Sequence, residues 1–310
     1  MFLHRFGPLA LLAMVFACAP ITTTSPSPSP QGAPVCRVLD TSTPFDIHIK
    51  TFDDLRVHSL VAPEISSGTA THILETPESL IVVDTQMLRD YARAFRAYAD
   101  KLDKPISHVI VSHAHPDHYF GLEYFEDLPT FALAPTLVQM KQRGNFHLRN
   151  HRENEGECDA VTDRVRMPAA TLEPGPKIIG GIEFLFEHLK RGEDNDQLVI
   201  AAPAHGVLVL QDLMATDTHG YVGGGMVDGW VAHLERYSQD SRYTYILAGH
   251  GVPTDASGLT TMIDYVQDGA QLLNSTENGP AFIEAMHKRF PDKHGDYLLE
   301  LMAALSFPKK

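Results

Sequence analysis

The sequence His113-Ala114-His115-Pro116-Asp117-His118 directly follows the short apolar run 106–112. That run is rich in β-branched residues and predicts a strand buried on both faces, so the loop after it is held rigidly. Two histidines at alternate positions on extended backbone point to the same side, and the turn after them brings Asp117 and His118 nearby. Imidazole nitrogen and carboxylate oxygen are ligands that zinc accepts in catalytic sites. The loop therefore predicts a metal centre.

The composition around this loop is that of a folded, acidic protein. The chain has 310 residues, 44% of them hydrophobic, and a formal net charge of -14. This length and composition allow a large core. An acidic surface repels phosphate backbones, which argues against a nucleic-acid partner and leaves a small-molecule substrate as the expected ligand.

Hydrophobic periodicity predicts strands on both sides of the histidine loop. The expected strands are 45–50, 55–62, 70–75, 80–84, 106–112, 130–133, 178–188, 198–202, 207–211 and 243–247. The expected helices are 87–102, 135–143, 227–237 and three within 254–307, and segment 145–164 reads as an irregular loop. Strands and helices occur in two successive blocks, so we expect an α+β domain of two sheets covered by helices.

The motif His113-x-His115-x-Asp117-His118 resembles the signature of the metallo-β-lactamase superfamily, and the resemblance covers most of the folded region. It implies a four-layer αβ/βα sandwich with a two-metal site at the shared edge of its halves. It also implies a metallo-hydrolase that uses a metal-activated water, and an ester, lactone or amide-like small molecule is the expected substrate. Two divalent cations are implied, with zinc as the expected metal and iron as the alternative.

Three further residues match positions of the family. Asp84, which ends the predicted strand 80–84, is similar to the acidic residue that orients the histidine loop. Asp212 resembles the carboxylate that bridges the two metals, and His250 in Gly249-His250-Gly251 resembles the last ligand of the second site. The resemblance gives catalytic roles to Asp84, Asp117 and His118. The metal ligands that it implies are His113, His115, Asp117, His118, Asp212 and His250.

The sequence departs from the family pattern at two positions. Glu193, in Gly192-Glu193-Asp194, stands where the family usually has a histidine ligand. A glutamate oxygen can bind zinc at a similar range, and the alkyl sulfatases look similar in using glutamate, so Glu193 is the expected seventh ligand. His188 remains the alternative ligand. Gln211 replaces the glycine that usually precedes the bridging aspartate.

Two more residues are candidates for contacting substrate. His219 lies seven residues after Asp212, where several relatives place a histidine near the substrate, and Tyr119 directly follows the motif. An ordinary loop histidine and a packing tyrosine are the competing interpretations. The other histidines outside the motif that we interpret as structural or surface residues are His72, His108, His147, His151 and His205.

Two rival functions stay open. Carboxylate-rich ligation through Glu193 suits iron, which keeps a di-iron redox enzyme of the same fold as an alternative. A non-catalytic metal-binding lipoprotein is the other. No Gly-x-Ser-x-Gly elbow, phosphate loop or dinucleotide fingerprint occurs in the sequence, so serine-hydrolase and nucleotide chemistry are not supported.

The N-terminal segment predicts export. Residues 1–18 begin with a short basic region and an apolar run too short to span a bilayer, the pattern of a signal peptide. Val15-Phe16-Ala17-Cys18 resembles a bacterial lipobox, with Ala17-Cys18-Ala19 as a competing cleavage site. Residues 19–35 form a Ser/Thr/Pro-rich linker, and 36–310 the metallo-β-lactamase-like domain with C-terminal helices. We therefore expect a periplasmic protein tethered to a membrane through lipidated Cys18.

Cys36 and Cys158 are the two remaining cysteines. In an oxidising compartment they either form a disulfide or remain free thiols, and their spacing does not decide between the two. The charge pattern of the C-terminal helices likewise leaves the oligomeric state open.

Overall fold

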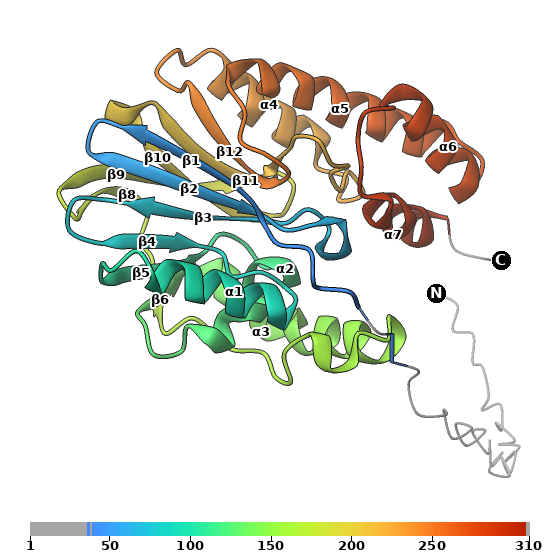
Figure 1. The fold of residues 1–310 in the computed structure, drawn as a ribbon. Helices are drawn as coiled ribbons and strands as arrows, with labels where there is room; N and C mark the ends of the chain where they lie inside the picture. The colour runs from blue at the N-terminus through green and yellow to red at the C-terminus, as the bar shows by residue number, and fades with distance from the viewer. Residues whose placement is uncertain (1–35, 38, 308–310) are drawn as a thin grey trace, which may run out of the picture. The chain divides into compact units, whose positions relative to one another are not determined.

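The computed structural model describes residues 36–37 and 39–307, which build two β-sheets with helices on their outer faces (Figure 1). The expected export signal, lipidation at Cys18 and linker lie outside these residues. Among the described residues, no helix combines the length and apolarity that crossing a membrane requires. The α+β fold expected from the sequence is confirmed.

The first sheet contains seven strands in chain order, antiparallel from β1 to β4 and parallel from β4 to β7. Its strands are β1 (Asp46–Phe52), β2 (Leu55–Val61), β3 (Ala70–Glu75), β4 (Leu80–Val83), β5 (Ile106–Val111), β6 (Thr130–Ala132) and β7 (Ala170–Thr171). The second sheet has the order β12-β11-β10-β9-β8, with only β11 and β12 parallel. Its strands are β8 (Gly175–Ile179), β9 (Ile182–Lys190), β10 (Asp196–Ala202), β11 (Val207–Ala215) and β12 (Tyr245–His250).

Helices cover the outer face of each sheet (Figure 1). Between strands of the first sheet lie α1 (Arg89–Asp100), α2 (Pro116–Tyr119) and α3 (Ala134–Arg149). Helix α4 (Val227–Ser238) lies between β11 and β12 of the second sheet, and α5 (Ala256–Ser275), α6 (Gly279–Arg289) and α7 (Asp296–Ser306) follow β12. Single turns are η1 (Glu64–Ser66), η2 (Phe120–Tyr124), η4 (Cys158–Ala160) and η5 (Pro203–His205), and η3 (Asn150–Asn154) is a π-helix that prolongs α3.

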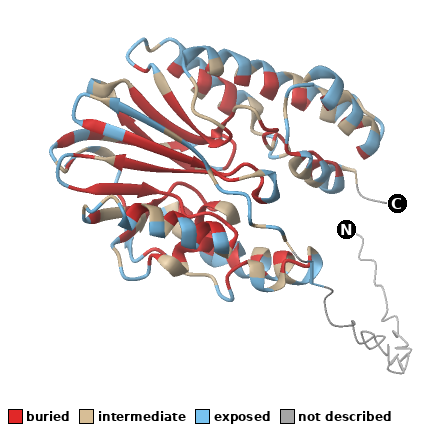
Figure 2. Cartoon of the chain, viewed as in Figure 1, coloured by how far each residue is buried: buried red, intermediate tan, exposed pale blue. Residues whose placement is uncertain are grey.

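Buried residues, red in Figure 2, concentrate in the strands of both sheets. Together with residues of the covering helices, their side chains form three layers of core. One lies between the two sheets and includes Ile81, Ile110 and Leu247. The other two lie between each sheet and its helices, around Phe95 and Trp230 respectively. Strand β5 supplies side chains to two of the cores, as expected for an apolar strand buried on both faces. The loop that leaves its C-terminal end is therefore fixed from both sides.

Two expectations about single elements were wrong. The expected strand 178–188 is two strands, β8 and β9, because Gly180 and Gly181 both have positive φ and turn the chain back on itself. The expected loop 145–164 begins as helix, since α3 continues to Arg149 and Leu148 is buried in the core. The three expected C-terminal helices are present as α5, α6 and α7.

A disulfide joins Cys36 to Cys158, with 5.6 Å between their Cα atoms. Of the two alternatives that the sequence left open, pairing is the one found. The bond ties the start of the domain to the segment that follows η3.

Candidate metal centre

Seven of the side chains singled out above lie at one edge of the two sheets. The chain ends of β5, β11 and β12 and the turn between β9 and β10 carry them. They form two groups of four potential ligands, and within each group the donor atoms lie within 4.8 Å of one another. The first group is His113, His115, Glu193 and Asp212, and the second is Asp117, His118, Asp212 and His250. Asp212 belongs to both groups.

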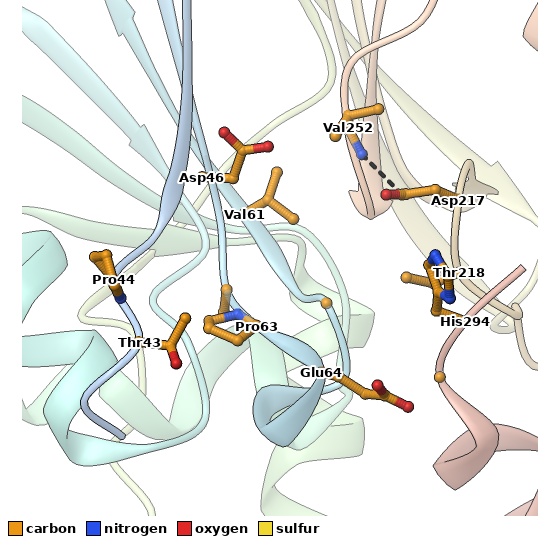
Figure 3. A pocket seen from close by; sticks show the side chains of 13 residues that line it. Thr43, Pro44, Asp46, Val61, Pro63, Glu64, Asp217, Thr218, Val252 and His294 are labelled. Carbon is orange, nitrogen blue, oxygen red and sulfur yellow. Dashed lines mark hydrogen bonds between the residues drawn. The ribbon is translucent and has the colours of Figure 1, made fainter. Parts of the chain in front are cut away.

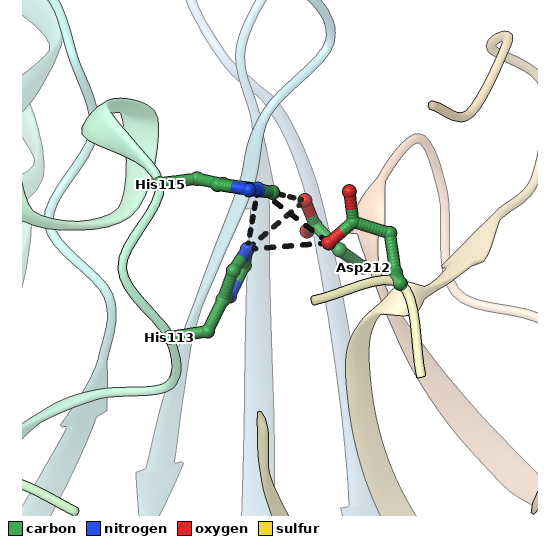
Figure 4. Close-up of side chains that lie close together, drawn as sticks. His113, His115 and Asp212 are labelled. Carbon is green, nitrogen blue, oxygen red and sulfur yellow. Dashed lines mark hydrogen bonds and ion pairs between the residues drawn. The ribbon is translucent and has the colours of Figure 1, made fainter. Parts of the chain in front are cut away.

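In the first group, the two imidazoles face two carboxylates. His113 Nε2 lies 3.3 Å from Asp212 Oδ2 and 3.8 Å from Glu193 Oε2. His115 Nδ1 lies 3.5 Å from Glu193 Oε2 and 3.0 Å from His113 Nε2. Figure 4 shows the rings of His113 and His115 directed toward the Asp212 carboxylate. Two nitrogens and two oxygens thus converge on one point.

The second group has the same composition. His118 Nε2 lies 3.1 Å from Asp212 Oδ1 and 3.3 Å from Asp117 Oδ2. His250 Nε2 lies 3.3 Å from Asp117 Oδ2 and 3.4 Å from Asp212 Oδ2. Asp212 Oδ2 therefore lies near His113 of the first group and His250 of the second, and Oδ1 lies near His118, so one carboxylate reaches both groups.

Hydrogen bonds at the far side of three imidazoles fix which nitrogen faces the centre. His118 Nδ1 donates to Asp84 Oδ2 (2.8 Å), and His250 Nδ1 donates to the Ser67 carbonyl (2.8 Å). Ser112 Oγ donates to Asp84 (2.7 Å), so it accepts from His113 Nδ1 (2.9 Å). In the neutral form of each ring, the nitrogen that faces the centre therefore carries the lone pair that metal ligation requires.

Asp84 holds the histidine loop from behind. It is fully buried and accepts from the backbone and hydroxyl of Ser112, from His118 and from the side-chain amide of Gln211. This matches the orienting role expected for Asp84. Ser112 was not predicted from the sequence, although a polar residue that ends an apolar strand beside the motif was the available signal. Thr69, whose hydroxyl donates to Asp117 Oδ2 (3.2 Å), was not predicted either.

The two departures from the family pattern are both accounted for structurally. Glu193 is buried with its carboxylate in the first group, whereas His188 Nε2 pairs with Asp196 Oδ1 at 2.7 Å and belongs to neither group. Gln211 points its amide at Asp84 rather than into the centre. Gly249 is required beside them, because a Cβ there would overlap Asp212 Oδ1.

Several buried donor atoms at the centre have no hydrogen-bond partner and could ligate a cation. Both oxygens of Glu193, Oδ1 of Asp212 and Nε2 of His118 are buried without a hydrogen-bond partner. Leaving such atoms unpaired is costly unless a bound ion completes them. Nitrogen and oxygen donors in this number suit two divalent cations, with zinc and iron both compatible.

The charges at the centre act on one another strongly. Burial lowers the pKa of His115, but the carboxylates of Glu193 and Asp212 outweigh it and raise that pKa to about 9. For His250, burial is likewise outweighed by Asp212, and the pKa rises to about 10. Burial and the neighbouring Asp212 raise the pKa of Glu193 to about 8. Without a cation, protons therefore neutralise the excess negative charge.

The two residues expected near the substrate belong to neither donor group. Tyr119 is fully buried in the core between the first sheet and its helices, with its ring against Phe120. His219 is buried beside Tyr265 and belongs to neither donor group. Packing is the interpretation that the structure favours for Tyr119.

A cavity of about 410 Å³ lies between segments 43–46 and 61–64 and the loops that follow β11 and β12 (Figure 3). Its lining includes Gly68, next to Thr69, and Val252, two residues after His250, but no member of the two donor groups. Asp217 lines it as well and accepts from the backbone of Val252 at 3.2 Å. The volume suits a small organic molecule.

Comparison with known proteins shows which family this chain belongs to. The family model described as "Metallo-beta-lactamase superfamily" matches residues 67–250, which contain every member of the two donor groups. The chain belongs to the metallo-β-lactamase superfamily. The fold, too, is that of solved superfamily members, and its donor groups lie within the matched segment.

Solved structures of this superfamily share the fold at low sequence identity. A metallo-β-lactamase from Pontibacter korlensis superimposes with a TM-score of 0.56 at 16% identity, over 72% of this chain and 100% of the other. The metallo-β-lactamase FIM-1 from Pseudomonas aeruginosa, solved in a mono-zinc form, gives a TM-score of 0.56 at 15% identity, over 75% of this chain and 99% of the other. These likenesses show the fold alone.

One curated relative is similar over a short stretch. The linear primary-alkylsulfatase of a Pseudomonas species (strain ATCC 19151) is 43% identical over 54 residues, which is 17% of this chain. The match spans a tenth of that protein's length. It bears on local sequence and not on the whole enzyme.

Proposed function

We propose that this protein is a metallo-hydrolase whose two donor groups hold two divalent cations. The observation that supports this most directly is the shared carboxylate of Asp212, whose two oxygens face different histidines. The unpartnered oxygens of Glu193 add to it, because a buried carboxylate without hydrogen bonds needs a counter-ion. Zinc is the metal that we expect.

When bound, divalent cations in such a site supply Lewis acidity toward water and toward a substrate oxygen. The chain's own residues prepare that chemistry. Asp84 and the Ser67 carbonyl hold His118 and His250 with their Nε2 lone pairs inward. Asp117 places its carboxylate between these two rings, with Oδ2 3.3 Å from each Nε2. It can therefore accept a hydrogen bond from an attacking water.

An ester, lactone or amide-like small molecule is the proposed substrate class. The cavity of about 410 Å³ is large enough for a ligand of that size. The short alkylsulfatase match adds sulfate esters to the molecules worth testing. The expected catalytic residues are Asp117 and His118, with Asp84 positioning His118.

A di-iron redox enzyme is the second candidate. The specific observation in its favour is Glu193, which gives the first group two carboxylates in place of one. Harder, oxygen-rich ligation suits iron better than a histidine-rich set does.

The deciding measurement is the metal content of the purified chain, read by elemental mass spectrometry, together with turnover of an ester, lactone, β-lactam and alkyl-sulfate panel. About two zinc ions per chain and turnover of one class support the hydrolase. Two iron ions and no hydrolysis favour the redox enzyme. Fewer than two metals of any kind would refute the two-metal centre.

The matched variants are His118→Ala and His108→Ala. His118 belongs to the second donor group, whereas His108 on β5 stacks on Phe131 with ring centroids 4.9 Å apart. We expect His118→Ala to lose most turnover and one metal, and His108→Ala to keep both. Full turnover by a metal-loaded His118→Ala would contradict the assignment.

Export and lipidation belong to the same proposal. The support is the sequence of residues 1–18, with the lipobox-like Val15-Phe16-Ala17-Cys18. We expect Cys18→Ser to abolish incorporation of labelled palmitate while leaving the folded domain intact. Equal labelling of both forms would rule out a lipid anchor at Cys18.

A further inference from the structure

A second cluster of ligand-type side chains lies where the C-terminal helices meet the loop after β11. His219 comes from that loop, His287 from α6, and Asp296 is the first residue of α7. One donor atom from each lies within 4.8 Å of the others, and His287 Nε2 is 2.8 Å from Asp296 Oδ1. None of the three residues belongs to the centre described above.

The hydrogen bonds of Tyr265 determine which nitrogen of His219 carries the hydrogen. The Tyr265 hydroxyl has one hydrogen, which it donates to the Gly220 carbonyl (3.0 Å). It must therefore act as acceptor toward the Gly220 backbone N–H (3.1 Å) and toward His219 Nδ1 (3.2 Å). His219 is accordingly protonated on Nδ1, and its Nε2 bears a lone pair.

The lone pair on His219 Nε2 accepts no hydrogen bond. His219 is 0% exposed, and its Nε2 has no hydrogen-bond partner. A buried acceptor without a partner destabilises the fold, and a ligand at this position would supply the missing partner. The other two members of the cluster are open to solvent, with 44% of the His287 side chain and 57% of the Asp296 side chain exposed. A solvent ion can therefore reach them.

We propose that His219, His287 and Asp296 form a separate zinc site. Two imidazoles and one carboxylate are a ligand set that zinc accepts, with solvent completing the coordination. Tyr265 holds His219 in the tautomer that ligation needs, as hydrogen-bond partners of zinc ligands commonly do. A zinc ion bound there would link α6 and α7 to the loop that follows β11. This proposal does not depend on the proposed hydrolase activity.

The backbone around the cluster is already in place. His219 N donates to the His294 carbonyl (2.7 Å), and His294 N donates to the Asp217 carbonyl (2.8 Å). The nearby ammonium of Lys293 is directed at the carbonyls of Ala215, Thr216 and Thr218, at 2.6–3.0 Å, and not at the cluster. A single carboxylate and this neighbouring charge lead us to expect micromolar binding.

The test is zinc titration of the full-length chain by calorimetry, starting from metal-free protein. We expect His287→Ala and Asp296→Asn each to bind one zinc ion fewer than wild type, or to bind that ion at least tenfold more weakly. His233→Ala is the matched control, since its half-buried imidazole on α4 donates to the Lys190 carbonyl and belongs to none of the ligand clusters. Identical zinc number and affinity in wild type and both variants would overturn the site.

Two further measurements keep the outcome interpretable. Because His287 and Asp296 are exposed, both variants should unfold at the wild-type temperature in chelator, and saturating zinc should raise that temperature more in wild type. In Asp212→Asn, which disrupts both groups of the main centre, the extra zinc should remain. If Asp212→Asn binds no zinc, or if zinc raises the unfolding temperature equally in wild type and His287→Ala, the proposed site is refuted.

Discussion

Gln211 lies inside β11 with a backbone φ of 47°, a conformation that favours glycine. A side chain in the left-handed region costs about 1–2 kcal/mol. The buried amide of Gln211 donates to the Asp84 carboxylate, and a hydrogen bond to a charged group contributes about 1.5–3 kcal/mol. The two effects nearly cancel in stability. What the side chain adds is orientation, because Asp84 in turn holds His118.

Replacing this residue separates the two effects. We expect Gln211→Gly to change the free energy of unfolding by no more than about 2 kcal/mol, while metal affinity falls about 10-fold or more, as when other hydrogen-bond partners of ligands are lost. Urea unfolding and competition with a chelator measure the two quantities. A variant that binds metal as tightly as wild type would show that Gln211 only packs.

Glu193 supplies one of the four potential ligands of the first donor group. Glu193→Ala removes one of its two carboxylates, so we expect the chain to retain one metal ion, held by the second group. Glu193→His should restore binding and shift selectivity from iron toward zinc, because it exchanges an oxygen for a nitrogen ligand. His188→Ala is the control, as His188 pairs with Asp196. Loss of metal in the control alone would reverse the assignment.

At the scale of elements, the π-helix η3 is held by one histidine. His151 is buried, and its Nδ1 lies 2.8 Å from Glu157 and 3.1 Å from Glu155. Burial lowers the pKa of His151, but the two carboxylates outweigh it and raise the pKa to about 9. Since the folded-state pKa lies above the unfolded value, protonation stabilises the fold. That stabilisation is complete below about pH 6.5 and is lost as the pH rises through 9.

The corresponding variant is His151→Asn. We expect wild type to lose up to about 3 kcal/mol of unfolding free energy between pH 6 and pH 9.5 through this group, and the variant to lose less. Urea unfolding at both pH values gives the difference. Parallel pH dependence in both proteins would mean that the pair with Glu155 and Glu157 does not stabilise η3.

Local pattern predicted most elements because the strands are short, β-branched runs and the helices have one apolar face. It failed where the decisive information was tertiary. The turn at Gly180 splits an apolar run that periodicity alone reads as continuous. Helix α3 extends through polar residues because Leu148 is buried against the first sheet's core.

The site shows the same division. His113, His115, Asp117 and His118 are adjacent in sequence, so spacing alone brought them together. The cluster of His219, His287 and Asp296 joins residues that only the packing of α6 and α7 against a distant loop makes neighbours. Motif spacing along the sequence cannot predict contacts between residues that far apart in the chain.

At the scale of the whole molecule, the disulfide closes a long loop. Cys36 and Cys158 are 122 residues apart, so the loop contains most of the first sheet. Restricting the unfolded chain to this extent stabilises the fold by about 2–4 kcal/mol. We expect Cys36→Ser with Cys158→Ser to lower the unfolding temperature while leaving metal content unchanged. An unfolding temperature insensitive to both the substitutions and a reductant would contradict this.

The same disulfide determines which part of the domain bears a force applied to the chain before Cys36. Strand β1 is the edge of the first sheet, and tension applied upstream of it would peel it from β2 one hydrogen bond at a time. Cys36 precedes β1, so such tension divides between that strand and a covalent path to Cys158. A pull on the N-terminus therefore reaches the interior of the chain without unzipping the edge strand, and only reduction exposes β1 to it.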